Sequence, residues 1–389
     1  MRKKVAISLL ATVALASSLY ADAKVGGNIR TIHSAYKNDN TQNNYATAVG
    51  VELYYELAKY KGFNTAVAFR TTHDISILSG DDSKRNDELS GQKATYTELT
   101  QAYIDYENKD FNFRMGRQII DTPLADSDDI RMMPNSFRAC VANYSSDDFT
   151  LTAGHIVSWQ GSDAGLDSSW QKTGKDGVSF SGVSYEDKLF DTNLWFYNIS
   201  NNEEKDIANN AIYFDITGHI NIQENISLDI SMQYLNETQL NKSGIEANIY
   251  GVMSELSYNN LGLMVAYNSS LQQKGKHSFS GYGGGTLFTN MDTMILDEIT
   301  EDRDAQAMVI ALSYEVGDVA LSYAYGTFNG DADTTGEKAD IVEQDIVVEY
   351  IPQDNLTLAF TYILDENKEY SNSEDFNANN LRVSASYDF

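Results

Sequence analysis

The sequence predicts an all-β protein, a transmembrane antiparallel β-barrel of about 18 strands with short periplasmic turns and long external loops. Three observations indicate this fold. They are an alternating C-terminal segment, an N-terminus typical of exported proteins, and a series of alternating segments joined by connections of two lengths. In a barrel, lipid-facing and lumen-facing side chains alternate along each strand, so the apolar residues recur with a period of two.

The C-terminal segment, residues 381–389, alternates between apolar and polar side chains without a break. Its apolar positions, which would face lipid, end with Tyr387 and Phe389, and its polar positions include Arg382. We expect Tyr387 and Phe389 to act as the signal by which the barrel-assembly machinery inserts the chain into the membrane. The edge strand of a soluble protein can show the same alternation, so this segment does not decide the fold alone.

The N-terminal residues 1–23 have the three parts of a signal peptide: a basic start, an apolar run and a small-residue site at Ala21-Asp-Ala23. We expect export to remove them and residues 24–389 to form a single barrel domain. Beyond this segment no run of about 18 apolar residues occurs, so no helix is expected to span a bilayer. An exported chain of this kind would enter the outer membrane of a Gram-negative cell as a barrel.

Alternation of apolar and polar residues predicts the individual strands. One of the clearest is the segment from Ile226 to Tyr234, in which every second residue is apolar and the others are Ser, Asp, Ser and Gln. The predicted strands are residues 25–36, 46–60, 62–78, 95–108, 110–120, 136–146, 148–160, 176–186, 188–199, 208–222, 225–238, 244–258, 261–272, 304–315, 318–328, 341–351, 354–366 and 379–389.

The connections between these segments alternate between short and long. The short ones are pairs of turn-forming residues such as Lys61-Gly62 and Gly317-Asp318. The long ones are polar and include residues 79–94, 121–135 and 273–303. Outer-membrane barrels separate periplasmic turns from external loops in this way, whereas a soluble sandwich has no reason to sort its loops by length.

The composition restricts the partners of the chain. Its formal net charge of −28 disfavours binding of nucleic acid and favours cations. The single cysteine, Cys140, cannot form an intrachain disulfide. The 25 tyrosines supply amphipathic rings for both rims of a barrel, where it meets outer-membrane lipid and lipopolysaccharide. The five histidines lie at no metal-ligand spacing, so neither a metal nor a cofactor is predicted.

The candidate functional site is the loop at residues 121–135 with its flanking strands. Pro123 and Pro134 bracket this loop, and proline lacks the donor that a strand ladder needs. Folded inward, the loop would narrow the lumen and set an acidic loop against a basic wall, which would select solutes by charge. The alternative is that each residue is a solvated loop charge. The candidate constriction residues are Arg114, Arg117, Asp121, Asp126, Asp128, Asp129, Arg131 and Arg138.

Three segments of this region resemble the OprD family of Gram-negative porins. They are Gly116-Arg-Gln118, Arg131-Met-Met-Pro-Asn-Ser-Phe137 and Leu151-Thr-Ala-Gly-His155. The resemblance extends weakly over the whole chain through the leader, the length, the strand number and the terminal Phe389. It implies an 18-stranded channel, monomeric or loosely trimeric, with a ladder of arginines on one wall and a constriction loop opposite.

The resemblance also implies which arginines belong to the ladder: Arg117, Arg131 and Arg138. Inward parity on their own strands adds further lumen candidates: Arg70, Arg382, Glu343 and Asp345. The two acids would either add to a preference for cations or be ordinary lumen polarity.

These observations predict a porin, a passive diffusion channel for ions and small hydrophilic solutes, rather than an enzyme. One alternative is an outer-membrane adhesin or structural protein with a non-conducting barrel. Another is a barrel hydrolase with a triad on its rim, because triads are spatial rather than sequential. The sequence leaves open which solute passes and whether the protein is a monomer or a homotrimer.

Overall fold

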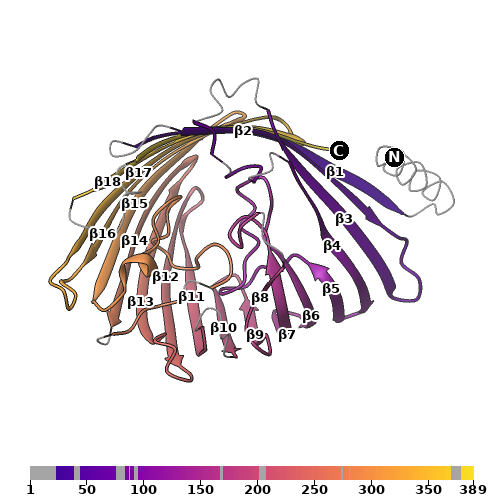
Figure 1. Ribbon diagram of the computed structural model, residues 1–389, viewed down its shortest axis with the longest axis horizontal. Coiled ribbons are helices and arrows are strands. Elements are labelled where there is room, and N and C mark those ends of the chain that lie inside the picture. Colours follow the sequence, from indigo (N-terminus) through magenta and orange to yellow (C-terminus); the bar gives the residue numbers. More distant parts are fainter. Residues whose placement is uncertain are drawn as a thin grey trace.

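The computed structural model describes residues 23–38, 44–75, 84–86, 88–91, 95–166, 170–200, 207–272, 275–279, 281–368 and 378–389. The predicted leader therefore lies, apart from Ala23, outside the described residues. Within these ranges, 19 strands form one sheet. The sheet closes into a barrel because β1 (Lys24–Asn38) pairs antiparallel with both β2 (Asn44–Glu56) and β19 (Ala378–Asp388). Figure 1 shows the strands around an interior that holds several loop segments.

Each of the predicted segments forms one long strand, which confirms the barrel and its strand order. Within the described ranges, the one strand that the alternation did not predict is the two-residue β8 (Gln171–Lys172). It pairs with the end of β7, while β7 itself pairs with β9. The other strands are β3 (Phe63–Asp74), β4 (Thr95–Asn108), β5 (Phe111–Gln118), β6 (Ser136–Ser146), β7 (Phe149–Gln160), β9 (Val178–Glu186), β10 (Phe190–Ile199), β11 (Asn209–Gln223), β12 (Ile226–Gln239), β13 (Ala247–Tyr258), β14 (Leu261–Gln272), β15 (Ala305–Val316), β16 (Val319–Gly330), β17 (Ala339–Gln353) and β18 (Leu356–Asn367).

Apolar side chains recur at every second position because each strand has its outer face toward lipid and its inner face toward the barrel interior. On β12, Met232 is 57% exposed on the outer face, whereas its neighbours Ser231 and Gln233 are buried in the interior. Closure pairs β1 with β19 at the seam, and a bilayer demands such pairing because it offers no water to satisfy free N–H and C=O groups. None of the helices in the described ranges is long and apolar enough to cross a membrane.

The short connections are tight turns. Lys61 and Gly62 have φ values of 50° and 87°, and Lys109, Asp147 and Asn259 also adopt positive φ. Such turns match the right-handed twist of the paired strands. They lie at the end of the barrel where the predicted periplasmic turns were placed.

The large apolar cluster of this molecule lies inside the barrel, between the wall and the loops that fold into it. It combines inward side chains of the wall, such as Phe137 and Trp159, with loop residues such as Leu124, Tyr282 and Met294. The strand β5 prepares this arrangement because it is only 8 residues long. After Gln118 the chain leaves the wall and enters the interior.

Candidate functional site

Two loops cross the interior. We name residues 119–135 the first inner loop and residues 281–303 the second inner loop; in Figure 1 they are the purple and orange segments inside the ring of strands. The first is the predicted constriction loop. The second falls within the long connection predicted at residues 273–303, but its inward fold was not predicted. It contains a short 3₁₀ helix, η3 (Leu296–Ile299).

The first inner loop is held at both ends by apolar contacts. Leu124 and Ala125 are buried in the large interior cluster, and the backbones of Thr122 and Ala125 exchange hydrogen bonds around Pro123. Met132 and Met133 are buried in a second cluster with Ile32 of β1 and Ala48 of β2. The loop therefore spans between two packed sites rather than extending into solvent.

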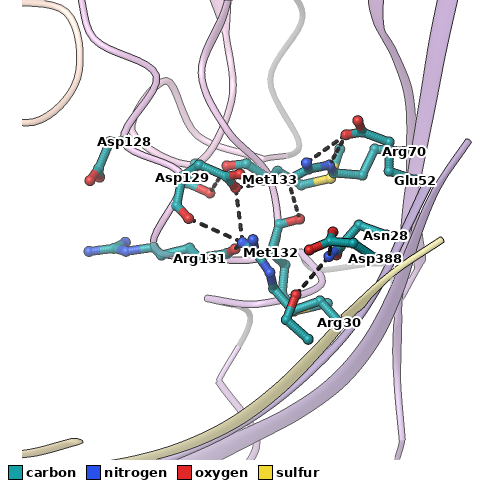
Figure 2. Close-up of polar contacts among 12 residues, drawn as sticks. Asn28, Arg30, Glu52, Arg70, Asp128, Asp129, Arg131, Met132, Met133 and Asp388 are labelled. Atoms are coloured by element: carbon teal, nitrogen blue, oxygen red, sulfur yellow. Dashed lines mark hydrogen bonds and ion pairs between the residues drawn. The ribbon is translucent and has the colours of Figure 1, made fainter. Parts of the chain in front are cut away.

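Asp129 ties the tip of this loop to the wall (Figure 2). Its Oδ1 lies 2.9 Å from Nη1 of Arg30 on β1 and 2.9 Å from Nη1 of Arg70 on β3. Arg70 also binds Glu52 of β2, with 2.5 Å between Nη2 and Oε2. Arg30 donates further to the carbonyl oxygen of Arg131 at 2.5 Å. Arg70 was a predicted lumen residue, whereas Arg30 and Glu52 were missed.

The other charges of the loop point elsewhere. Figure 2 shows the side chains of Asp128 and Arg131 directed away from the strands that carry Arg30 and Arg70. Asp128 lies near Asp163 of the next long connection, and Asn135 donates to the Asp163 carboxylate at 2.6 Å. The sequence did not predict Asp163 as a site residue, because its hydrogen-bond partner Asn135 lies 28 residues away in the chain.

The carboxyls of Asp121, Asp126 and Asp128 form an acidic face of the first inner loop, and Asp163 of the next long connection lies beside it. Burial, and then the neighbouring Asp163, raises the pKa of Asp128 to about 6. Burial also raises the pKa of Asp126, to which Asp121 and Asp163 add. The crowding of like charges therefore makes Asp128 harder to ionise than a free aspartate, so that it becomes neutral as the pH falls through about 6.

The second inner loop joins the first through backbone pairing. The N–H of Tyr282 donates to the Leu124 carbonyl at 3.0 Å, and the N–H of Asp126 donates to the Tyr282 carbonyl at 2.9 Å. The Tyr282 ring packs edge-on against Trp159, and its hydroxyl donates to the carbonyl of Thr173 in a third loop. Gly283, at φ 114°, permits this close approach, because a Cβ there would lie 2.2 Å from the Asp126 carbonyl oxygen.

The second inner loop is also tethered to the wall. Glu343 on β17 is fully buried and accepts the N–H groups of Thr293 and Met294 at 2.9 and 2.6 Å. Asp345 accepts the N–H of Asp292 at 3.4 Å. Glu343 and Asp345 were expected as lumen acids. Both side chains point inward as predicted. Their carboxylates bind the backbone of the second inner loop, so the loop covers them.

Arg382 on β19 forms a bidentate pair with Asp292 of the second inner loop, at 3.0 and 2.8 Å. Arg382, Asp292 and Arg131 all lie close enough to Glu88 to act on its charge. Burial raises the pKa of Glu88, and the two arginines oppose that rise. The structure thus brings together Arg131 and Arg382, which are predicted residues, with Glu88 and Asp292, which are not.

Two adjoining cavities lie between the first inner loop and the wall. One, of about 350 Å³, is lined by Arg114, Asn143 and Thr152; the other, of about 410 Å³, is lined by Asp126 and Asp215. Both include Asp121, Thr122 and Trp195 in their lining. Arg114 itself pairs with the buried Asp105 at 3.0 Å, so its charge is balanced below the loop.

Arg117 and Arg138, the ladder arginines that the resemblance implied, make no hydrogen bond or ion pair with the aspartates of the first inner loop within the described ranges. Arg138 alternates with Phe137 and Ala139, which belong to the interior cluster, and its register partner across the strands is Arg117. The Arg117 guanidinium bonds Glu98, and the register partner of Glu98 on β3 is Arg70, which faces the lumen. Within the described part of the chain they contact Trp170 and Glu98 rather than the loop aspartates.

The terminal residues close the barrel seam. The N–H and C=O of Phe389 exchange hydrogen bonds with the backbone of Gly27, both at 3.0 Å. Tyr387 pairs with Ile29 on β1 and is exposed on the outer face. Their proposed part in membrane insertion remains a prediction.

Comparison with known proteins agrees with this architecture. The family model for the outer membrane porins of the OprD family matches residues 88–388. The chain belongs to this family. As an OprD-family porin it is an outer-membrane channel protein of Gram-negative type. No curated protein matches it in sequence.

Solved porin structures share the fold of this OprD-family chain. OpdK of Pseudomonas aeruginosa with vanillate superposes with a TM-score of 0.78 at 14% identity, over 95% of this chain and 99% of that one. OccAB2 of Acinetobacter baumannii gives 0.79 at 14% identity, over 96% and 99%. OccK8 (OprE) of Pseudomonas aeruginosa gives 0.76 at 11% identity, over 95% and 98%. At such identities these structures establish the fold alone.

Proposed function

We propose that this porin is a passive diffusion channel for ions and small hydrophilic solutes, with its selectivity set at the two inner loops. The observation that carries the proposal is the double ion pair of Asp129 with Arg30 and Arg70. A loop fixed in this way is a permanent narrowing of the lumen rather than a mobile external segment. We further propose that residues 1–23 are the exported leader and residues 24–389 the barrel domain.

The charges near this narrowing support selection by an acidic loop and a basic wall. Asp121, Asp126 and Asp128 lie on the acidic face, and Arg131 and Arg382 lie around Glu88 and Asp292. Where a lumen narrows, water is scarce and salt screens fixed charges poorly, so such charges act strongly on passing ions. In this proposal the basic side of the narrowing consists of Arg131, Arg382 and the wall arginines Arg30 and Arg70, in place of Arg117 and Arg138.

Planar-bilayer recording of the purified barrel tests this proposal. We expect stepwise conductance, a rise in cation preference for Arg131→Gln, and a fall for Asp128→Asn at pH 8, where that carboxyl is charged. As a control for Arg131→Gln, Lys188→Gln removes one positive charge from an exposed periplasmic turn and should leave ion selectivity unchanged.

Each alternative gives a different recording. A barrel that never conducts would favour the adhesin or the rim hydrolase. Conductance with equal selectivity in Arg131→Gln, Asp128→Asn and Lys188→Gln would place the narrowest point away from these residues.

A further inference from the structure

One wall of the lumen is acidic and carries a single basic side chain. The consecutive strands β9 to β13 contain no lysine or arginine, and His219 on β11 is their one histidine. Their carboxylates, like His219, stand at inward positions, because exposed apolar residues such as Leu194, Ile212 and Ile230 occupy the alternate positions. These carboxylates belong to Glu186, Asp191, Asp215, Asp229, Glu237 and Glu255. A proton on His219 therefore supplies the only positive side-chain charge on these strands.

His219 joins three strands through the two nitrogens of its ring. Its Nδ1 lies 2.9 Å from Oδ1 of Asp229 on β12, and its Nε2 lies 3.0 Å from Oδ2 of Asp191 on β10. Ionised carboxylates accept hydrogen bonds and cannot donate them, so each contact needs an N–H from the ring. Neutral imidazole has one N–H, whereas imidazolium has two. The geometry therefore fits the charged form of His219.

Two further acids extend this bridge along the same row of the wall. Glu186 on β9 is the register partner of Asp191, and Glu255 on β13 is the register partner of Asp229. Both glutamates are exposed. The row thus crosses five neighbouring strands and presents four carboxylates around one histidine, so the proton of His219 decides a large share of its charge.

The row lies between the constriction and the end of the barrel that carries the short turns. The backbone N–H of His219 donates to the Leu189 carbonyl of one such turn at 2.8 Å. Toward the constriction, Asp215 has the same inward parity as His219 and lines the cavity that Asp126 of the first inner loop also lines. The acidic wall therefore continues from the first inner loop to the short turns.

Other charged groups near the bridge do not replace His219. The turn between β9 and β10 carries Asp187 and Lys188, which are exposed and opposite in sign. The N–H of Asp187 donates to Oδ1 of Asp191 at 3.3 Å, so the turn adds a backbone donor to the bridge.

We propose that His219 is a specificity-determining residue of the channel, whose proton sets the charge of the wall along which cations leave the constriction. With the proton, the imidazolium offsets one of the two aspartates that it binds. Without it, the row gains one negative charge and attracts cations more strongly. Histidine gains and loses its charge near physiological pH, so cation preference follows the pH at this end of the lumen. This inference rests on the proposed channel function.

Planar-bilayer recording of the barrel at pH 6 and pH 9 tests the proposal in an Asp128→Asn background, which removes the titration of the first inner loop. We expect the cation-to-anion permeability ratio to rise with pH, by roughly twofold more than in His219→Gln, the effect of one unit charge acting across water. His219→Gln should give a raised ratio already at pH 6. His219→Lys should keep the low ratio up to pH 9, because lysine remains charged.

The matched control is His155→Gln. His155 pairs in register with Cys140, which pairs with Met115, and Met115 is 54% exposed on the outer face. The same substitution there should leave the titration of the parent unchanged. Asp229→Asn is a second test of the wall, because it removes a carboxylate from the bridge and should lower the ratio at pH 9.

Two results would overturn the proposal. One is a permeability ratio that is the same in His219→Gln, His219→Lys and the parent at both pH values. The other is an unchanged ratio at pH 9 in Asp229→Asn, which decides alone if the histidine variants fail to fold. A barrel that never conducts would defeat the proposed channel function and this inference with it, so the two failures differ.

Discussion

Arg70 and Asp129 lie 59 residues apart in sequence, yet Nη1 of Arg70 is 2.9 Å from Oδ1 of Asp129. Arg70 comes from the wall and Asp129 from the first inner loop, so this pair connects the barrel to its constriction. The Arg70 side chain is only 9% exposed and keeps a second carboxylate partner in Glu52. The pair is therefore a bridge in which one buried cation holds a wall acid and a loop acid together.

Asp129→Asn should loosen the first inner loop. The change removes the charge that Arg30 and Arg70 share, and we expect it to destabilise the folded barrel by roughly 1–2 kcal/mol, since Asp129 is partly exposed. Heat-dependent gel mobility measures the stability, and open-channel current noise measures the loop. Asp148→Asn, in an exposed periplasmic turn, is the matched control. Identical noise in both variants would show that the ion pair does not hold the loop.

Selectivity should change with pH through Asp128. Burial and Asp163 raise the pKa of Asp128 to about 6, so this carboxyl is charged at pH 7 and becomes neutral as the pH falls through about 6. Cation preference should therefore decrease between pH 7 and pH 5, as measured by reversal potentials. In Asp128→Asn that step should disappear. A step of the same size and midpoint in the variant would assign the titration to another group.

Tyr282→Phe should loosen the second inner loop from the third loop, which carries Thr173, without creating a cavity. The ring contacts with Trp159 and Phe279 remain, but the Thr173 carbonyl loses its hydroxyl donor. We expect a loss of about 1 kcal/mol in stability, against about 3–5 kcal/mol for Tyr282→Ala, which also creates a cavity. Hydrogen exchange of the loop amides measures the local effect. Tyr314→Phe, at an exposed outer-face ring, is the control.

Deletion of Phe389 should reduce the amount of barrel in the outer membrane while export continues. Its backbone pairs with Gly27 across the seam, and its ring ends the outer face of β19. Tyr387→Asp should act in the same direction because a charge would face lipid. Membrane fractionation measures the yield, with Phe149→Ala as an exposed aromatic control on another strand. Full yield after the deletion would reject the insertion signal.

The strands could be predicted from the sequence because their cause is local. A residue on a barrel strand meets either lipid or the interior, and that choice appears directly as alternation. The turns followed for the same reason, since residues such as Lys61-Gly62 supply the backbone geometry that a hairpin needs.

The constriction was determined only in part by the sequence. The paired prolines and the aspartates marked the first inner loop, but loops have no period that indicates their partners. Asp129 binds Arg30, which lies 99 residues away in the sequence. Thr293 and Met294 of the second inner loop bind Glu343, which lies 50 and 49 residues away. Only closure of the barrel brings β1, β3, β17 and β19 around one lumen, so the tertiary structure alone decided which charges pair and which loops fold inward.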